Sequence, residues 1–102
     1  MKNFFALLFF IHLSFAIIAQ DSAGIQFEDL SWEEALEVAQ DEDKIIFVDA
    51  YTTWCGPCKW MNANVFSVDE VGEFYNANFV NVKLDMEKGE GPKFARKYRV
   101  QA

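Results

Sequence analysis

Along the middle of the chain, the spacing of apolar and polar side chains is typical of a helix in some segments and of a strand in others. A Ser-x-x-Glu capping box formed by Ser31 and Glu34 precedes apolar residues at helical spacing, which predicts a helix over about 32–40 and then a polar turn. Residues 45–48 form an apolar run that is too short for a helix, so they predict a central, buried strand. Residues 79–84 predict a second strand.

Helices are expected to connect and follow these strands. One should begin near Cys55, and a second capping box at residues 67–70 predicts a short helix that ends near Tyr75. Because strand, helix and strand follow in this order, we expect the two strands to pair in parallel through a right-handed crossover. Pro92 suits the first turn of a last helix that ends at Tyr98, and residues 99–102 are expected to begin an extended segment.

The first 19 residues differ from the rest of the chain, because 15 of them are apolar. Lys2 gives a positive start, and Ala19 offers a small residue at a cleavage point before Gln20. This pattern predicts a cleaved signal peptide over 1–19 and an exported protein, periplasmic or otherwise extracytoplasmic. The apolar stretch falls just short of the roughly 17–25 residues that a spanning helix needs, so an uncleaved membrane anchor is the alternative.

Residues 20–102 are expected to form one small α/β domain. These 83 residues carry 8 basic and 16 acidic side chains, a net charge of −8. An acidic balance argues against a nucleic-acid partner or an anionic membrane surface, since both require an electropositive footprint. Six of the bases lie within residues 83–102, which we interpret as a solvated basic helix near the C-terminus.

The cysteine and histidine content excludes several kinds of site. Cys55 and Cys58 are the two cysteines of the chain, and its one histidine, His12, lies in the predicted leader. A structural zinc site would need more ligands, and a hydrolase with a cysteine or serine nucleophile would need an imidazole base. We therefore expect no metal and no organic cofactor, and the remaining possibilities are sulfur chemistry or no chemistry.

Residues 54–59, Trp-Cys-Gly-Pro-Cys-Lys, directly follow the first predicted strand. The amino end of the following helix would stabilise a thiolate at Cys55 and lower its pKa from about 8.5 towards neutrality. Cys58, one turn deeper, would then be the resolving cysteine, and Pro57 is tolerated in the first turn of a helix. The alternative is a structural disulfide, although so short a loop restricts the unfolded chain very little.

This motif, after a strand with the sequence Ile-Ile-Phe-Val-Asp, resembles the thioredoxin family, and residues 44–102 resemble the first two thirds of a thioredoxin-like domain. The resemblance implies a catalytic pair, Cys55 and Cys58, that forms a redox-active disulfide. It also implies that Asp49 is the buried acid that takes a proton from Cys58, and that Lys83 is the lysine that accompanies this acid. The alternatives are a turn residue for Asp49 and a solvated charge at the sheet edge for Lys83.

Other residues of the motif are expected to surround the active site. They are Trp54, Gly56, Pro57 and Lys59. Tyr51 is either an aromatic residue of the site or a core residue, and Trp60 is expected to pack within the fold.

Residues 64–67, together with Val71 and Phe74, are similar to the exported branch of the family, which includes the C-terminal domain of the membrane thiol–disulfide interchange protein. The Gly-Pro pair resembles that of reducing members, which implies a protein-disulfide reductase with protein disulfide substrates and an unidentified thiol–disulfide electron donor. The alternatives are a disulfide oxidase or isomerase, and a non-enzymatic thioredoxin-like binding module with a structural disulfide. The family's cis-proline loop, C-terminal strands and closing helix have no counterpart in these 102 residues, so we expect the chain to be a piece of a longer one.

Overall fold

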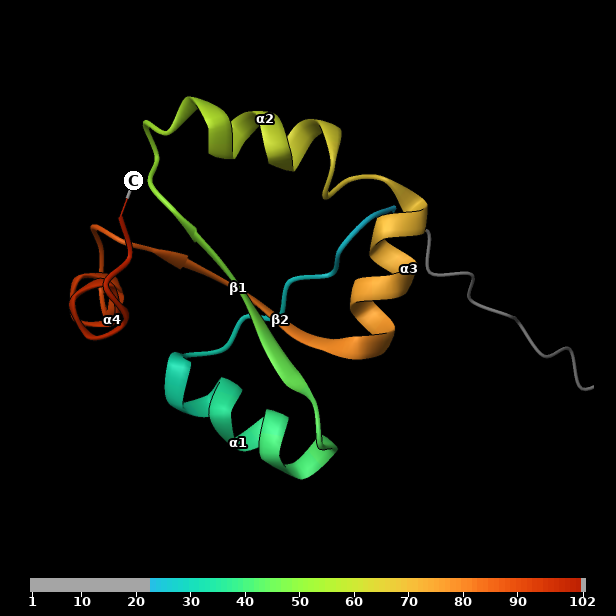
Figure 1. The fold of residues 1–102 in the computed structure, drawn as a ribbon, viewed down its shortest axis with the longest axis horizontal. Coiled ribbons are helices and arrows are strands. Elements are labelled where there is room, and N and C mark those ends of the chain that lie inside the picture. The colour runs from blue at the N-terminus through green and yellow to red at the C-terminus, as the bar shows by residue number, and fades with distance from the viewer. Residues whose placement is uncertain (1–22, 102) are drawn as a thin grey trace, which may run out of the picture.

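The computed structural model describes residues 23–101, which form four helices and two strands (Figure 1). In chain order these are α1 (Trp32–Glu42), β1 (Ile45–Tyr51), α2 (Gly56–Asn64), α3 (Asp69–Asn78), β2 (Phe79–Asp85) and α4 (Gly91–Tyr98). The predicted signal peptide over 1–19 lies outside the described residues. Within residues 23–101, no helix is long and apolar enough to cross a membrane.

The two strands pair in parallel, as predicted, and both α2 and α3 lie on the connection between them. In the register of this pair, Val48 lies opposite Val82 and Asp49 lies opposite Lys83. Both strands therefore end at the same edge of the sheet, where α2 and the loop before α4 begin (Figure 1). This edge brings together residues that are about 30 positions apart in the chain.

Four elements extend beyond their predicted ends, among them α3, which ends at Asn78, and β2, which ends at Asp85. Helix α1 continues to Glu42, and Asp43 ends it in the left-handed conformation with a φ of 52°. Strand β1 continues to Tyr51, because its pairing with β2 runs on through Asp49. The polar turn after α1 is thus shorter than expected, and Asp49 lies inside strand β1.

One of the two predicted capping boxes is confirmed and the other is wrong. Ser31 Oγ accepts a hydrogen bond from the Glu34 N–H at 3.1 Å, and the Ser31 N–H donates to Glu34 Oε2 at 2.8 Å. The Ser67 hydroxyl instead donates to the carbonyl of Ala63 at 2.6 Å. Helix α3 consequently begins after Val68 without a side-chain cap.

The buried core lies between α1 and β2. Val80 and Val82 are 2% and 0% exposed and pack with Ala35 and Ala39 of α1. The prediction of a central, buried strand at residues 45–48 is wrong, because β1 is half-buried and Ile45 is 72% exposed. β2 is the buried strand because β1 covers one of its edges, while the segment before α1 bonds to the other through the Glu28 N–H and the Asn81 carbonyl, at 2.8 Å.

The segment before α1 packs closely against α3, and its Phe27 ring contacts another aromatic side chain. Gly24 adopts a φ of 85°, and a Cβ atom on Gly72 would overlap the Gly24 backbone. The Ile25 N–H donates to the carbonyl of Phe66 at 2.7 Å. Phe27 then packs against the Phe66 ring, with centroids 6.0 Å apart.

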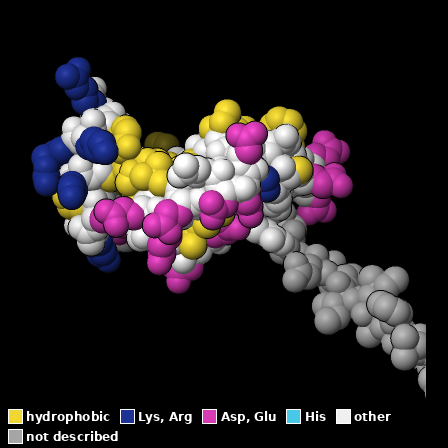
Figure 2. Space-filling model, turned by 90° about the horizontal axis from the view of Figure 1, so that it is seen from below, with side chains coloured by type: hydrophobic (Ala, Val, Ile, Leu, Met, Phe, Trp, Pro, Cys, Tyr) yellow, Lys and Arg dark blue, Asp and Glu magenta, His cyan; other side chains and the backbone are white. Residues whose placement is uncertain are grey.

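Helix α4 matches its predicted range, with Pro92 in its first turn and Phe94 buried. Its exposed side carries Lys93, Arg96 and Lys97, as expected for a solvated basic face. In Figure 2, Lys and Arg side chains gather at one end of the face shown, and Asp and Glu side chains lie along much of the remainder. The expected extended segment does not begin at Arg99, which ends the helix in a left-handed conformation with a φ of 53°.

Candidate functional site

The two cysteines lie where β1 gives way to α2. Cys55 is the N-cap residue of α2, and it forms a disulfide with Cys58 across a Cα–Cα distance of 5.3 Å. The Cys58 N–H donates to Cys55 Sγ at 3.2 Å. A sulfur atom therefore caps the helix in the position where serine or aspartate oxygen usually does. The predicted placement of the motif at a strand-to-helix junction is confirmed.

The outer side of the disulfide is open to solvent. Gly56 and Pro57 are exposed on this side. A Cβ atom added at Gly56 would have no neighbour within 4 Å.

Trp54 forms one wall of this outer side. Its side chain is 67% exposed, and its indole N–H donates to Glu87 Oε1. Glu87 lies in the loop between β2 and α4, and the Met86 N–H of that loop donates to the Tyr51 carbonyl at 2.8 Å. Two hydrogen bonds thus join the end of β1 and the turn after it, which leads to the disulfide, to the loop between β2 and α4.

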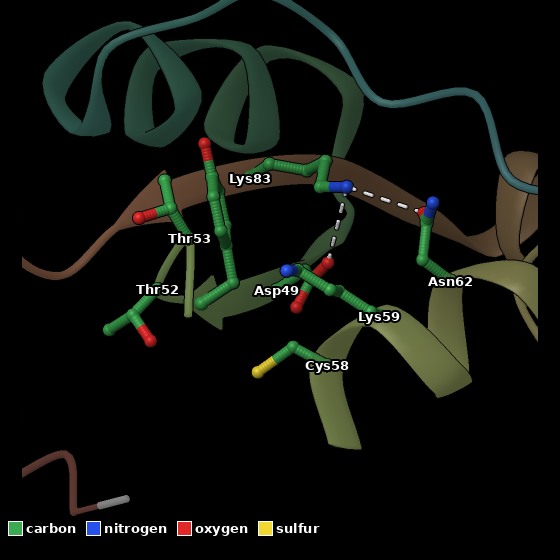
Figure 3. A pocket seen from close by; sticks show the side chains of 8 residues that line it. Asp49, Thr52, Thr53, Cys58, Lys59, Asn62 and Lys83 are labelled. Atoms are coloured by element: carbon green, nitrogen blue, oxygen red, sulfur yellow. Dashed lines mark hydrogen bonds and ion pairs between the residues drawn. The ribbon is translucent and has the colours of Figure 1, made fainter. Parts of the chain in front are cut away.

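The inner side of the disulfide faces a cavity of about 250 Å³ (Figure 3). Residues from β1, the following turn, α2 and β2 line it: Asp49, Tyr51, Thr52, Thr53, Cys58, Lys59, Asn62 and Lys83. Cys58 belongs to this lining and Cys55 does not. The two sulfurs therefore have different surroundings, although they are bonded to each other.

Asp49 and Lys83 lie next to each other across the two strands. Lys83 Nζ is 3.7 Å from Asp49 Oδ2, and the Asp49 side chain is 12% exposed. Burial raises the pKa of Asp49 above its ordinary value, and the Lys83 charge lowers it without cancelling the effect of burial. The reading of Asp49 as a turn residue at the strand end is wrong, because it lies inside β1.

The Lys83 ammonium is held by more than its ion pair. It donates to Asn62 Oδ1 at 3.3 Å and lies 5.1 Å and 5.3 Å from the ring centroids of Phe27 and Tyr51. A solvated charge at the sheet edge is therefore the wrong description of Lys83. Tyr51 belongs to the site, since it lines the cavity and faces this lysine.

Several residues of the site were not identified from the sequence. Asn62 lies one helical turn after Cys58, so the i, i+4 rule could have placed it on the same face. The Thr52 hydroxyl is buried beside the cavity and has no hydrogen-bond partner among the described residues. Glu87 is 33 residues from Trp54, and no local sequence pattern indicates that the two side chains bond. Trp60, expected to pack within the fold, is 60% exposed.

A family model described as thioredoxin-like matches residues 26–99. This chain belongs to the thioredoxin-like family. Its α/β architecture agrees with that of a solved structure, a proposed disulphide-isomerase from Bacteroides thetaiotaomicron. That protein is 52% identical, with a TM-score of 0.69 over 79% of this chain and 67% of the other.

Curated relatives cover the same thioredoxin-like region. The chloroplastic thioredoxin Y2 of Arabidopsis thaliana is 41% identical over 66 residues, which are 65% of this chain and 36% of that protein. Protein disulfide-isomerase of Gallus gallus is 43% identical over 56 residues, which are 53% of this chain and 10% of that protein. This thioredoxin-like chain thus spans about a third of the plant relative and a smaller part of the isomerase.

Proposed function

We propose that this protein is a thiol–disulfide oxidoreductase that reduces protein disulfides through Cys55 and Cys58. The observation that carries the proposal is the pair's position at the amino end of α2, where the Cys58 N–H donates to Cys55 Sγ. That donor and the positive end of the helix dipole favour a thiolate at Cys55. Membership of the thioredoxin-like family supports the same chemistry.

The reaction consumes one substrate disulfide and the reduced dithiol. The Cys55 thiolate attacks one substrate sulfur, so a mixed disulfide forms and the other substrate sulfur leaves as a thiolate that takes a proton. Cys58 then loses its proton and attacks Cys55 Sγ. The second substrate thiol is released, the Cys55–Cys58 disulfide remains, and two electrons have passed to the substrate. A partner dithiol protein must return the pair to its reduced form.

Asp49 is the group we assign to the proton of Cys58. Both residues line the same cavity, and burial raises the pKa of the Asp49 carboxyl towards the range where an acid–base group works near neutral pH. Lys83 limits this rise through its positive charge. The mechanism needs no metal and no organic cofactor, because sulfur carries the electrons and a carboxylate carries the proton.

The open outer side of the disulfide is the proposed docking site for substrate. Trp54, Gly56 and Pro57 are exposed around Cys55, and the exposed Lys59 also lines the cavity. An exposed indole offers a large apolar contact with few rotatable bonds, a feature common to residues that dominate interfaces. The partners we propose are protein disulfides and a thiol–disulfide electron donor.

The proposed location is outside the cytoplasm, and it depends on the leader over residues 1–19. N-terminal sequencing of the native protein from cell fractions tests this location. A first residue at or near Gln20 in a soluble extracytoplasmic fraction supports export and cleavage. Recovery of Met1 in a membrane fraction would favour the uncleaved anchor.

An oxidase or isomerase is the second candidate, and the names of two similar proteins favour it. One is the proposed disulphide-isomerase from Bacteroides thetaiotaomicron and the other is the protein disulfide-isomerase of Gallus gallus. The residues between the cysteines constrain the reduction potential only loosely, so the direction of electron flow needs a measurement. A non-enzymatic module with a structural disulfide is the third possibility.

The reduction potential of the Cys55–Cys58 pair separates these candidates. It can be measured by equilibrating the full chain with glutathione or dithiothreitol buffers and alkylating the free thiols. A value near about −270 mV supports a reductase, and about −120 to −180 mV supports an oxidase or isomerase. A value well below about −300 mV, together with no turnover of a protein disulfide, would indicate a structural bridge.

A further inference from the structure

The Lys83 ammonium lies between two oxygen acceptors that belong to different elements. It is 3.3 Å from Asn62 Oδ1 on α2 and 3.7 Å from Asp49 Oδ2 on β1. Figure 3 shows the two contacts leaving the same nitrogen in different directions. The shorter contact is the one to the neutral amide, although an ammonium prefers a carboxylate when both are equally accessible.

The strand register alone does not explain this preference. Lys83 and Asp49 are direct partners in the parallel pair, so the lysine could reach the carboxylate without moving the backbone. The rings of Phe27 and Tyr51 flank the ammonium but offer no oxygen acceptor at that nitrogen. Asn62 is thus a second oxygen acceptor that competes with the Asp49 carboxylate for the Lys83 ammonium.

We propose that Asn62 is a positioning residue, which holds Lys83 at a distance from Asp49 and thereby keeps Asp49 able to accept the proton of Cys58. This inference rests on the proposed function, since it concerns the release step of that reaction. Asn62 touches neither the sulfurs nor the substrate in this scheme. It acts through Lys83, whose charge would otherwise hold Asp49 ionised and make it a weaker base.

Other charged and titratable groups face Asp49 from the elements around it. Lys83 comes from β2, Lys59 and Cys58 come from α2, and Tyr51 comes from β1 itself. Lys83 is the cation within ion-pair distance of Asp49. A neutral side chain on α2 can therefore change the acidity of Asp49 by changing the position of the Lys83 ammonium.

Two substitutions of Asn62 should shift the titration of the Asp49 carboxyl in opposite directions. A purely structural role of Asn62 would not give opposite shifts. Asn62→Leu removes the acceptor, so Lys83 closes on Asp49 and the carboxyl titrates at lower pH. Asn62→Asp strengthens the competing acceptor and adds a negative charge, so Asp49 titrates at higher pH. Asn62→Gln retains an amide oxygen and should leave the titration close to that of the wild type. Asn62 is exposed, so each variant is expected to fold.

The matched controls use another asparagine of the same helix. Asn64 donates from Nδ2 to the Trp60 carbonyl at 2.9 Å and does not line the cavity. Asn64→Leu and Asn64→Asp repeat the same changes in size and charge on α2. Neither control should move the titration of Asp49 by more than a small fraction of the shift at Asn62.

The experiment is an NMR titration of the Asp49 carboxyl carbon in the reduced full chain, with each variant compared with the wild type. A downward shift of the Asp49 midpoint in Asn62→Leu, with an upward shift in Asn62→Asp, supports the proposal. An unchanged or raised Asp49 midpoint in Asn62→Leu overturns it, as do equal shifts in the Asn64 variants.

This readout does not depend on turnover of a protein disulfide. If wild-type protein fails to reduce disulfides but the two Asn62 variants shift the Asp49 midpoint in opposite directions, the proposed function fails and the positioning role stands. If the wild type reduces disulfides and the Asn62 variants do not shift the midpoint, the positioning role fails alone.

Discussion

The two sides of the disulfide differ in almost every physical property. On the outer side, Trp54 is 67% exposed and Gly56 has open space around it. On the inner side, Cys58 shares a cavity with Asp49, whose side chain is 12% exposed, and with Lys83. Of the two bonded cysteines, Cys58 shares its surroundings with a largely buried carboxylate, and Cys55 does not line that cavity. This difference suggests that substrate capture and product release depend on separate sets of residues.

Substitution of either cysteine should have the largest effect, because each cysteine is needed for a different step of the proposed reaction. Cys58→Ala leaves the outer side intact but removes release, so stable mixed disulfides with a protein substrate should accumulate. Cys55→Ala removes capture, and few such species should form. Non-reducing gels with mass spectrometry of the linked peptides measure both outcomes. If Cys55→Ala traps more substrate than Cys58→Ala, the two roles are reversed.

Asp49→Asn should have the next largest effect, and it should fall on the inner side alone. The amide cannot accept the proton of Cys58, so release should slow by roughly 10²-fold, within the usual range for loss of a positioned general base. Formation of the mixed disulfide should stay within about twofold of wild type, because Asp49 lines the inner cavity and its side chain is largely buried. Rapid-quench kinetics with a fluorescent disulfide substrate separates the two steps. Equal slowing of both steps would contradict the division between the two sides.

The same substitution should stabilise the fold, with an effect that depends on pH. Burial raises the folded-state pKa of Asp49 above its unfolded-state pKa, so ionisation of this carboxyl lowers the stability of the fold. The wild type therefore loses stability as pH rises from the unfolded-state pKa through the folded-state pKa. Asp49→Asn should therefore gain on the order of 1 kcal/mol at pH 7 and little near pH 3, where the carboxyl is protonated in both states. Urea unfolding of oxidised protein at the two pH values checks this. Equal stabilisation at both pH values would show that the gain is not electrostatic.

Local sequence signals predicted the elements that position the site. The strand, the Cys-x-x-Cys motif and the helix after it were recognisable because each depends on residues that are neighbours in the chain. Ser31 and Ser67 begin the same four-residue pattern, yet Ser67 bonds back to Ala63. The sequence cannot distinguish them, because the outcome depends on where the preceding helix ends.

The inner side was predicted less completely because its geometry comes from pairing across the fold. Asp49 and Lys83 were identified through a family resemblance, and the register of β1 with β2 accounts for their contact. Asn62 needed only helical spacing from Cys58, whereas Phe27 reaches Lys83 through a segment that crosses α3. β1 was expected to be the buried strand, but the burial falls on β2, which is covered along both edges.

The smallest expected effect lies on the outer side, at the hydrogen bond between Trp54 and Glu87. The bond fixes an exposed indole beside the disulfide and links it to the loop before α4. Glu87→Ala should free the indole and weaken capture of a protein disulfide by a few-fold, because an exposed hydrogen bond contributes about 0.5–1.5 kcal/mol at most. Glu87→Gln retains an acceptor and should recover most of that loss.

The rate of the release step should be unchanged in both Glu87 variants, which is the reverse of the expectation for Asp49→Asn. Glu73→Ala, at an exposed position of α3, removes the same charge at another place and controls for the change in net charge. Capture is measured as the second-order rate of mixed-disulfide formation in the Cys58→Ala background, at two salt concentrations, and release is measured by rapid-quench kinetics with Cys58 present. A slower release step in Glu87→Ala would show that the loop communicates with the cavity. The two sides of the disulfide would then be coupled, because the loop of Glu87 also bonds to the Tyr51 backbone.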